Sequence, residues 1–113
     1  MRTMSKATLA NEEARRTYEE IRAAERRALE TLDEAGSETS ANDGGAAVRK
    51  ARALVLRLRE MIEELREIGE DCDDEKEAVD IKRAVAEREV ALENTRAIVR
   101  EAALDAAAKE RAR

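Results

Sequence analysis

The chain has 113 residues, enough for one domain, and it combines 43% charged residues with a formal net charge of −5. It contains one cysteine and no histidine, which excludes an internal disulfide and histidine-based catalytic triads. The longest run of large apolar residues is Leu54-Val55-Leu56, so we expect no transmembrane helix, no signal peptide and a soluble protein of cytoplasmic type.

The composition favours α-helix throughout the chain. Alanine, leucine, glutamate, arginine and lysine, which are strong helix formers, dominate it, and charged residues alternate with apolar ones at helical spacing. The 23 alanines are about as numerous as the larger aliphatic residues, so the core should be thin. The negative net charge argues against a nucleic acid as partner.

A first helix is predicted from about residue 5 to residue 35. Asn11, followed by two glutamates, is typical of a helix cap with an acidic first turn. The helix therefore starts either near residue 5 or at Asn11, in which case the first ten residues form a short extra helix. Gly36 is expected to stop it. Small and apolar residues at steps of three and four form its inner face: Ala7, Ala10, Ala14, Ile21, Ala24, Ala28 and Ala35.

A second helix is predicted from about residue 44 to residue 69, after an irregular loop over residues 36–43. Asn42 or Asp43 is the predicted cap, and Gly69 is expected to end the helix before a tight turn over residues 69–73. The apolar face is wide enough to touch two neighbouring helices. Its main seam consists of Val48, Val55, Leu58, Ile62 and Leu65.

A third helix is predicted from about residue 73 to residue 112, with Asp74 as its cap and Glu77 three residues later. Its main seam consists of Ile81, Val85, Leu92 and Val99. A weaker apolar stripe containing Val79, Val90 and Leu104 lies nearly opposite.

The lengths of these helices constrain their assembly. At about 1.5 Å per residue, the second helix would be roughly 39 Å long and the third roughly 60 Å long. The end of the third helix should therefore extend past the second. Either the loop that begins at Gly36 or another chain would cover this end, and the second case predicts a homo-oligomer formed through the weaker stripe of the third helix. The predicted fold is all-α, a single domain over residues 1–113 that forms an antiparallel up-down-up bundle of three long helices.

The acidic stretch from Glu67 to Asp80 raises the question of a metal site. A calcium loop that starts at Asp71 would have Lys76 and Lys82 where glycine and glutamate are required. A zinc site would need histidine or further cysteines. We therefore interpret the acids as helix-capping residues and Cys72 as a structural or incidental thiol. We expect neither a metal site nor a cofactor.

Two charged residues lie on otherwise apolar stripes. Glu25 lies fourteen residues after Asn11, and Arg88 lies fourteen residues after Asp74. If the two caps lie at the same height in parallel helices, the two side chains meet at one level. The hypothesis is an interhelical Glu25–Arg88 pair that helps to set the register. The alternative is that both side chains reach out to water.

A local basic run is more simply explained. It is followed at once by acidic residues and has no aromatic residues among its members, so we interpret it as a solvated face. The run consists of Arg49, Lys50, Arg52, Arg57 and Arg59.

The whole chain resembles computationally designed helical bundles. The segments NEEARR, RLREMIEELREIGED and DDEKEAVDIKRAVAEREVALE carry the resemblance through charged exteriors, aliphatic seams and acidic caps. Cys72, Met61 and the loop GSETSANDGG are not idealised choices, and they resemble designs assembled from recombined natural helical fragments. The resemblance implies a stable helical fold without an evolved activity.

We therefore expect a structural protein that is not an enzyme, has no cofactor and requires no partner. The alternative is a natural, coiled-coil-like protein–protein interaction module that self-associates. A third, weaker alternative is a binder of small apolar ligands, because seams rich in alanine can leave cavities.

Overall fold

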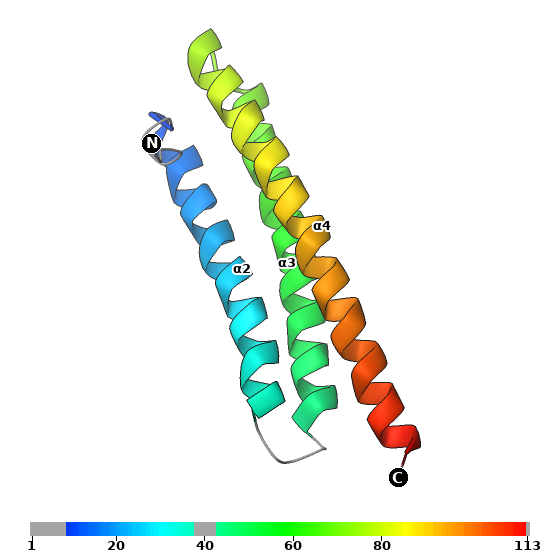
Figure 1. Ribbon diagram of the computed structural model, residues 1–113. Helices are drawn as coiled ribbons and strands as arrows, with labels where there is room; N and C mark the ends of the chain where they lie inside the picture. Colours follow the sequence, from blue (N-terminus) through cyan, green and yellow to red (C-terminus); the bar gives the residue numbers. More distant parts are fainter. Residues whose placement is uncertain (1–8, 38–42, 113) are drawn as a thin grey trace, which may run out of the picture.

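The computed structural model describes residues 9–37 and 43–112, which form three helices. These are α2 (Glu12–Ser37), α3 (Asp43–Glu70) and α4 (Glu75–Arg111), and the described residues contain no strand. Figure 1 shows that α2 and α4 run in the same direction and that α3 runs opposite to both. The predicted all-α antiparallel bundle is confirmed. None of the helices in the described ranges has a stretch that is apolar and long enough to cross a membrane.

The helix boundaries differ from the predicted ones near both ends of α2. This helix begins at Glu12 and residues 9–11 are not helical, which agrees with the later of the two predicted starts. The predicted extra N-terminal helix lies outside the described residues. Gly36 does not stop α2, which runs to Ser37. The helix α4 begins at Glu75, two residues after the predicted start, because Asp74 is the cap itself.

The core lies along the line where the three helices meet. Each of the nine residues predicted to form the seams of α3 and α4 is buried. On the inner face of α2, Ala14 and Ala28 are completely buried together with Ile21. An alanine methyl group fills little space, so this face of α2 must lie close to its neighbours to exclude water.

Leu9 is a core residue that the helical pattern did not include. Its side chain is only 2% exposed although it precedes α2, and it joins the main hydrophobic cluster. The guanidinium of Arg15 donates a hydrogen bond of 3.1 Å to the Leu9 carbonyl oxygen. This bond, together with burial, holds the segment before α2 against the end of the bundle.

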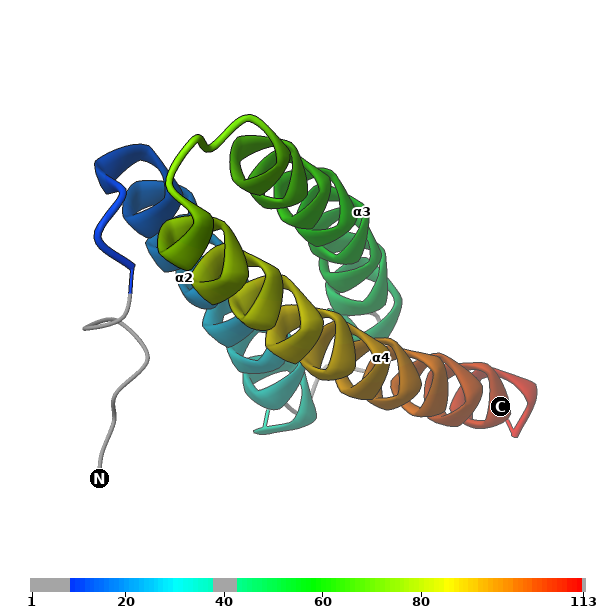
Figure 2. The same cartoon turned by 90° about the horizontal axis from the view of Figure 1, so that it is seen from above.

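The end of α4 extends past the core. Val99 is its last buried residue, yet the helix continues to Arg111. Figure 2 shows the last turns of α4 projecting beyond the other two helices. The exposed apolar residues of α4 include Val79, Val90 and Leu104, so its predicted second stripe is uncovered among the described residues.

Gly69 does not end α3, which continues to Glu70. Instead, Gly69 allows α3 and α4 to approach each other just before the turn. A Cβ atom added at Gly69 would lie 2.8 Å from Ile81 Cγ2 and 3.3 Å from Ile81 Cβ. Ile81 is 1% exposed and cannot turn away into solvent. The glycine is therefore required by packing rather than by a special backbone conformation.

We predict that Gly69→Ala destabilises the fold by about 1–3 kcal/mol, because the added methyl group overpacks the contact with Ile81. Gly45→Ala is the matched control, since its Cβ would meet only the end of the Arg49 side chain at 3.7 Å. That change should be neutral or stabilising by up to about 1 kcal/mol. Urea unfolding of both variants measures the difference, and equal effects would contradict the packing role of Gly69.

Candidate functional site

The most distinctive polar feature of the bundle is an ion pair between α2 and α4. Arg88 Nη1 lies 2.6 Å from Glu25 Oε1 and donates a hydrogen bond to it. The two side chains are only 11% and 10% exposed. The structure therefore brings together the two residues that the sequence placed fourteen positions after Asn11 and Asp74.

Two neighbours complete the surroundings of this pair. The guanidinium of Arg22 donates a second, longer hydrogen bond of 3.3 Å to Glu25 Oε1 from the partly exposed rim. The guanidinium carbon of Arg88 lies 5.5 Å from the centre of the Tyr18 ring, within the range of a cation–π contact. Glu25 thus interacts with two cations, and Arg88 is held between a carboxylate and an aromatic face.

The pair is not fully satisfied. Glu25 Oε2 and Arg88 Nε are buried and have no hydrogen-bond partner among the described residues. Removing two charges from water is costly, and unpaired polar atoms add to that cost. The pair is therefore a weak source of net stability. Loss of Glu25 would leave the charge of Arg88 without a carboxylate, and loss of Arg88 would leave Glu25 with only the longer contact to Arg22.

The capping residues explain why these side chains meet. Asn11 Oδ1 accepts a hydrogen bond of 2.9 Å from the backbone N–H of Ala14. Asp74 Oδ1 accepts hydrogen bonds from the backbone N–H groups of Lys76 and Glu77, at 2.9 and 3.1 Å. Each cap satisfies N–H groups that have no partner within the helix. Because both helices begin in this way, an equal count of residues brings Glu25 and Arg88 to the same level.

The predicted cap of α3 lies at the edge of the described residues. Asp43 is the first residue of α3, whereas a cap is the residue just before the helix, so Asp43 itself is not shown as the cap. The residue before it lies outside the described residues, and Asn42, the other predicted cap, stays a prediction. The Ser, Thr, Asn, Asp and Gly residues near this point all favour turns, so the pattern did not distinguish adjacent cap positions.

Two threonines are also buried in the core, and a second ion pair joins α3 to α4 at the surface. Thr95 is 4% exposed, and its hydroxyl donates a hydrogen bond of 2.9 Å to the Ala91 carbonyl oxygen on the same helix. Thr17 is buried next to Tyr18 in sequence. A second pair between helices, Arg66 with Glu89, connects α3 to α4 at the surface. The hydrogen bond that Arg66 donates to Glu89 raises the pKa of the Arg66 guanidinium, which therefore stays charged.

The acidic turn between α3 and α4 contains the only thiol of the chain. Cys72 Sγ donates a hydrogen bond of 3.3 Å to Glu77 Oε1. Two effects raise the pKa of the Cys72 thiol. The larger is partial removal from water, and the smaller is the hydrogen bond to Glu77. A thiol in this setting is less nucleophilic at neutral pH than an ordinary cysteine.

The acids of this turn do not converge on one point. Within residues 9–37 and 43–112, no group of three or more Asp, Glu, Cys or His side chains is close enough to hold a metal ion. Asp74, which has the strongest capping pattern, is used by two backbone N–H groups of α4. The structure thus gives the turn a geometric role in starting α4.

The predicted basic run is exposed at all five positions. Arg57 pairs with Glu60 on the same helix at 3.7 Å, while Arg52 and Arg59 lie on the side of α3 that faces α4.

Comparisons of the chain with protein-family models, with curated proteins and with solved structures each found no match.

We predict strong energetic coupling between Glu25 and Arg88. Glu25→Met or Arg88→Met alone should lower the free energy of unfolding by about 2–4 kcal/mol, because each removes the short contact that compensates a mostly buried charge. The double variant should lie within about 1 kcal/mol of the original protein or above it, since the apolar pair incurs no desolvation cost. Urea unfolding of the four proteins gives the coupling energy.

The exposed pair Arg57–Glu60 is the matched control for this cycle, because its side chains are 58% and 70% exposed. Its coupling should be at most about 0.5 kcal/mol. Equal coupling energies for the two pairs would show that the interhelical pair has no special role.

We predict that Cys72 is alkylated slowly, with a rate that rises through a pKa above that of an ordinary cysteine. The sign follows from the surroundings, because burial and the carboxylate of Glu77 both disfavour the thiolate. Glu77→Gln should speed the reaction with iodoacetamide at mildly alkaline pH. Asp73→Asn removes the same charge from a neighbouring exposed residue and serves as the control. Equal acceleration by both changes would contradict the role of Glu77.

Proposed function

We propose that this chain is a structural helical bundle without catalytic function, whose role is to form a rod of defined shape. The observation that carries the proposal is the interhelical pair of Glu25 and Arg88, at 2.6 Å and mostly buried. Opposite charges that neutralise each other in the interior suit a structural device that fixes how helices fit together. The charged exterior, the aliphatic seams and the explicit caps support a designed origin within this proposal.

The Glu25–Arg88 pair would fix the register of α2, which its alanine-rich inner face does not specify. The inner face of α2 is rich in alanine, and small side chains of similar shape can fit against a neighbour in more than one register. A shift of α2 by one turn would separate Glu25 from Arg88 and leave both charges mostly buried. Such a shift is costly, so the pair selects one register even if it adds little net stability.

The outer face of α4 favours a second candidate, a protein–protein interaction module. Val79, Val90 and Leu104 are 50%, 64% and 64% exposed. At about 100° per residue these three lie on one side of the helix, and the exposed Ala86 and Ala97 lie between them. An apolar stripe interleaved with small residues can pack closely against the same stripe of a second copy.

Sedimentation equilibrium distinguishes the two candidates. If α4 is an interaction surface, the protein should form dimers at high concentration, and Val90→Glu should weaken them at least about tenfold, because it places a charge in the apolar contact. Leu56→Glu is the control, since Leu56 is similarly exposed but lies on α3. A monomer at every concentration would rule out self-association through α4 and would favour the first candidate, the structural helical bundle.

A further inference from the structure

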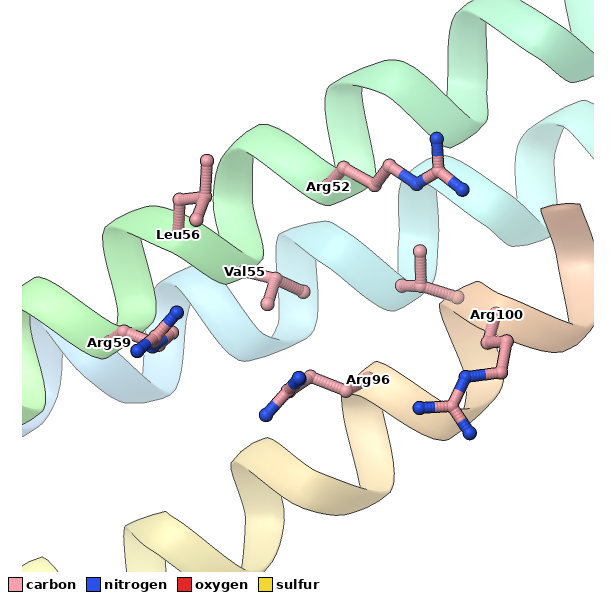
Figure 3. Close-up of a pocket in the computed structure, with 7 residues that line it drawn as sticks. Arg52, Val55, Leu56, Arg59, Arg96 and Arg100 are labelled. Carbon is pink, nitrogen blue, oxygen red and sulfur yellow. The ribbon is translucent and has the colours of Figure 1, made fainter.

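A groove between α3 and α4 combines arginines with aliphatic side chains. It has a volume of about 340 Å³, which lies at the lower end of the range for small-molecule sites. Figure 3 shows Arg52 and Arg59 on α3 and Arg96 and Arg100 on α4, with Val55 in the space between the two helices. Leu56 and Val99 complete the lining.

The apolar part of the lining forms a floor and one wall. Val55 and Val99 are 8% and 4% exposed and belong to the hydrophobic core, so the floor of the groove is firmly held. Leu56 is 59% exposed. A ligand with an apolar body would cover Leu56 and the outer surface of the two valines, and it would be stabilised by the area removed from water.

The charged part of the lining has one sign only, although the chain as a whole is negative. Arg52, Arg59 and Arg100 make no ion pair or hydrogen bond through their side chains with any residue in the described ranges. Arg96 has a contact of 3.1 Å with Glu93 on its own helix, and this contact is exposed. Four guanidinium groups around one groove repel one another, and a bound anion would relieve that repulsion.

We propose that this groove binds a small amphipathic organic anion, with an apolar body against Val55, Leu56 and Val99 and a sulfonate, carboxylate or phosphate among the arginines. Guanidinium groups bind such oxyanions through paired, charge-assisted hydrogen bonds. Inorganic anions would leave the apolar floor uncovered, and neutral apolar molecules would leave the guanidinium groups without a counter-charge. The groove lies on a different side of α4 from the stripe of Val90 and Leu104, and the site is independent of the proposed structural role.

The test is a fluorescence titration with anilinonaphthalene sulfonate, which has an apolar ring system and one sulfonate. Binding should saturate at one site, weaken as salt is added and shift amide NMR signals near residues 52–59 and 96–100. The double variant Arg59→Gln/Arg96→Gln should lower the affinity at least about tenfold, because one arginine is lost from each side of the groove. Restoring charge with Arg59→Lys/Arg96→Lys should recover part of it.

The matched control is Arg26→Gln/Arg27→Gln, which removes the same charge from two exposed residues of α2. Its affinity for the probe should stay within about twofold of the original protein. Circular dichroism of each variant verifies that the helices persist. The neutral analogue phenylnaphthylamine should bind the original protein at least about tenfold more weakly than the sulfonate, because it offers no charge to the arginines.

Three outcomes would overturn the proposal. The first is equal binding of the neutral analogue, which would make the groove a plain apolar surface. The second is NMR shifts outside the two segments. The third is displacement of the probe by a glutamate-rich peptide far below the concentration at which the probe itself binds, which would assign the groove to an acidic protein partner.

Discussion

The rest of the structure depends on how α2 is held against the pair formed by α3 and α4. The tight turn connects α3 to α4, and both contribute large aliphatic residues to their contact. The inner face of α2 relies mainly on alanine, with Ile21 and Tyr18 as its largest buried side chains. A face of this kind gives close packing but little shape to distinguish one register from the next. We attribute that distinction to the charges of Glu25 and Arg88, whose meeting is possible at only one level.

The small residues and the ion pair have complementary effects. Ala14, Ala28 and Ala51 are completely buried, and Gly69 lies against Ile81, so the helices can approach closely at several points. The side chains of Glu25 and Arg88 reach each other between α2 and α4, where they are mostly buried. Glu25 Oε2 and Arg88 Nε are buried without a hydrogen-bond partner among the described residues, which lowers the net stability that the pair contributes. This combination is the one we expect of a structural bundle whose sequence must specify one packing.

Much of the fold could be predicted because helical spacing and capping are local properties of the sequence. The seams of α3 and α4 and the caps Asn11 and Asp74 follow from residue type and position. The Glu25–Arg88 pair also followed, because equal counts from two caps give equal heights in parallel helices. The role of Gly69 did not follow, since its neighbour Ile81 belongs to another helix and no local pattern indicates their contact. The burial of Leu9 was missed for a similar reason, because Leu9 precedes the helical repeat.

The arginine groove was also hidden from the sequence. The basic run was visible as a stretch on one helix, but Arg96 and Arg100 lie far away along the chain and join it only in the folded bundle.

The measurement that tests the central claim most directly is a spin-label distance between α2 and α4. Labels at Glu19→Cys and Lys82→Cys, with Cys72→Ser, would be compared with and without Glu25→Met/Arg88→Met. We expect one narrow distance distribution with the ion pair and a broadened or divided one without it. Equally narrow distributions in both proteins would contradict the account.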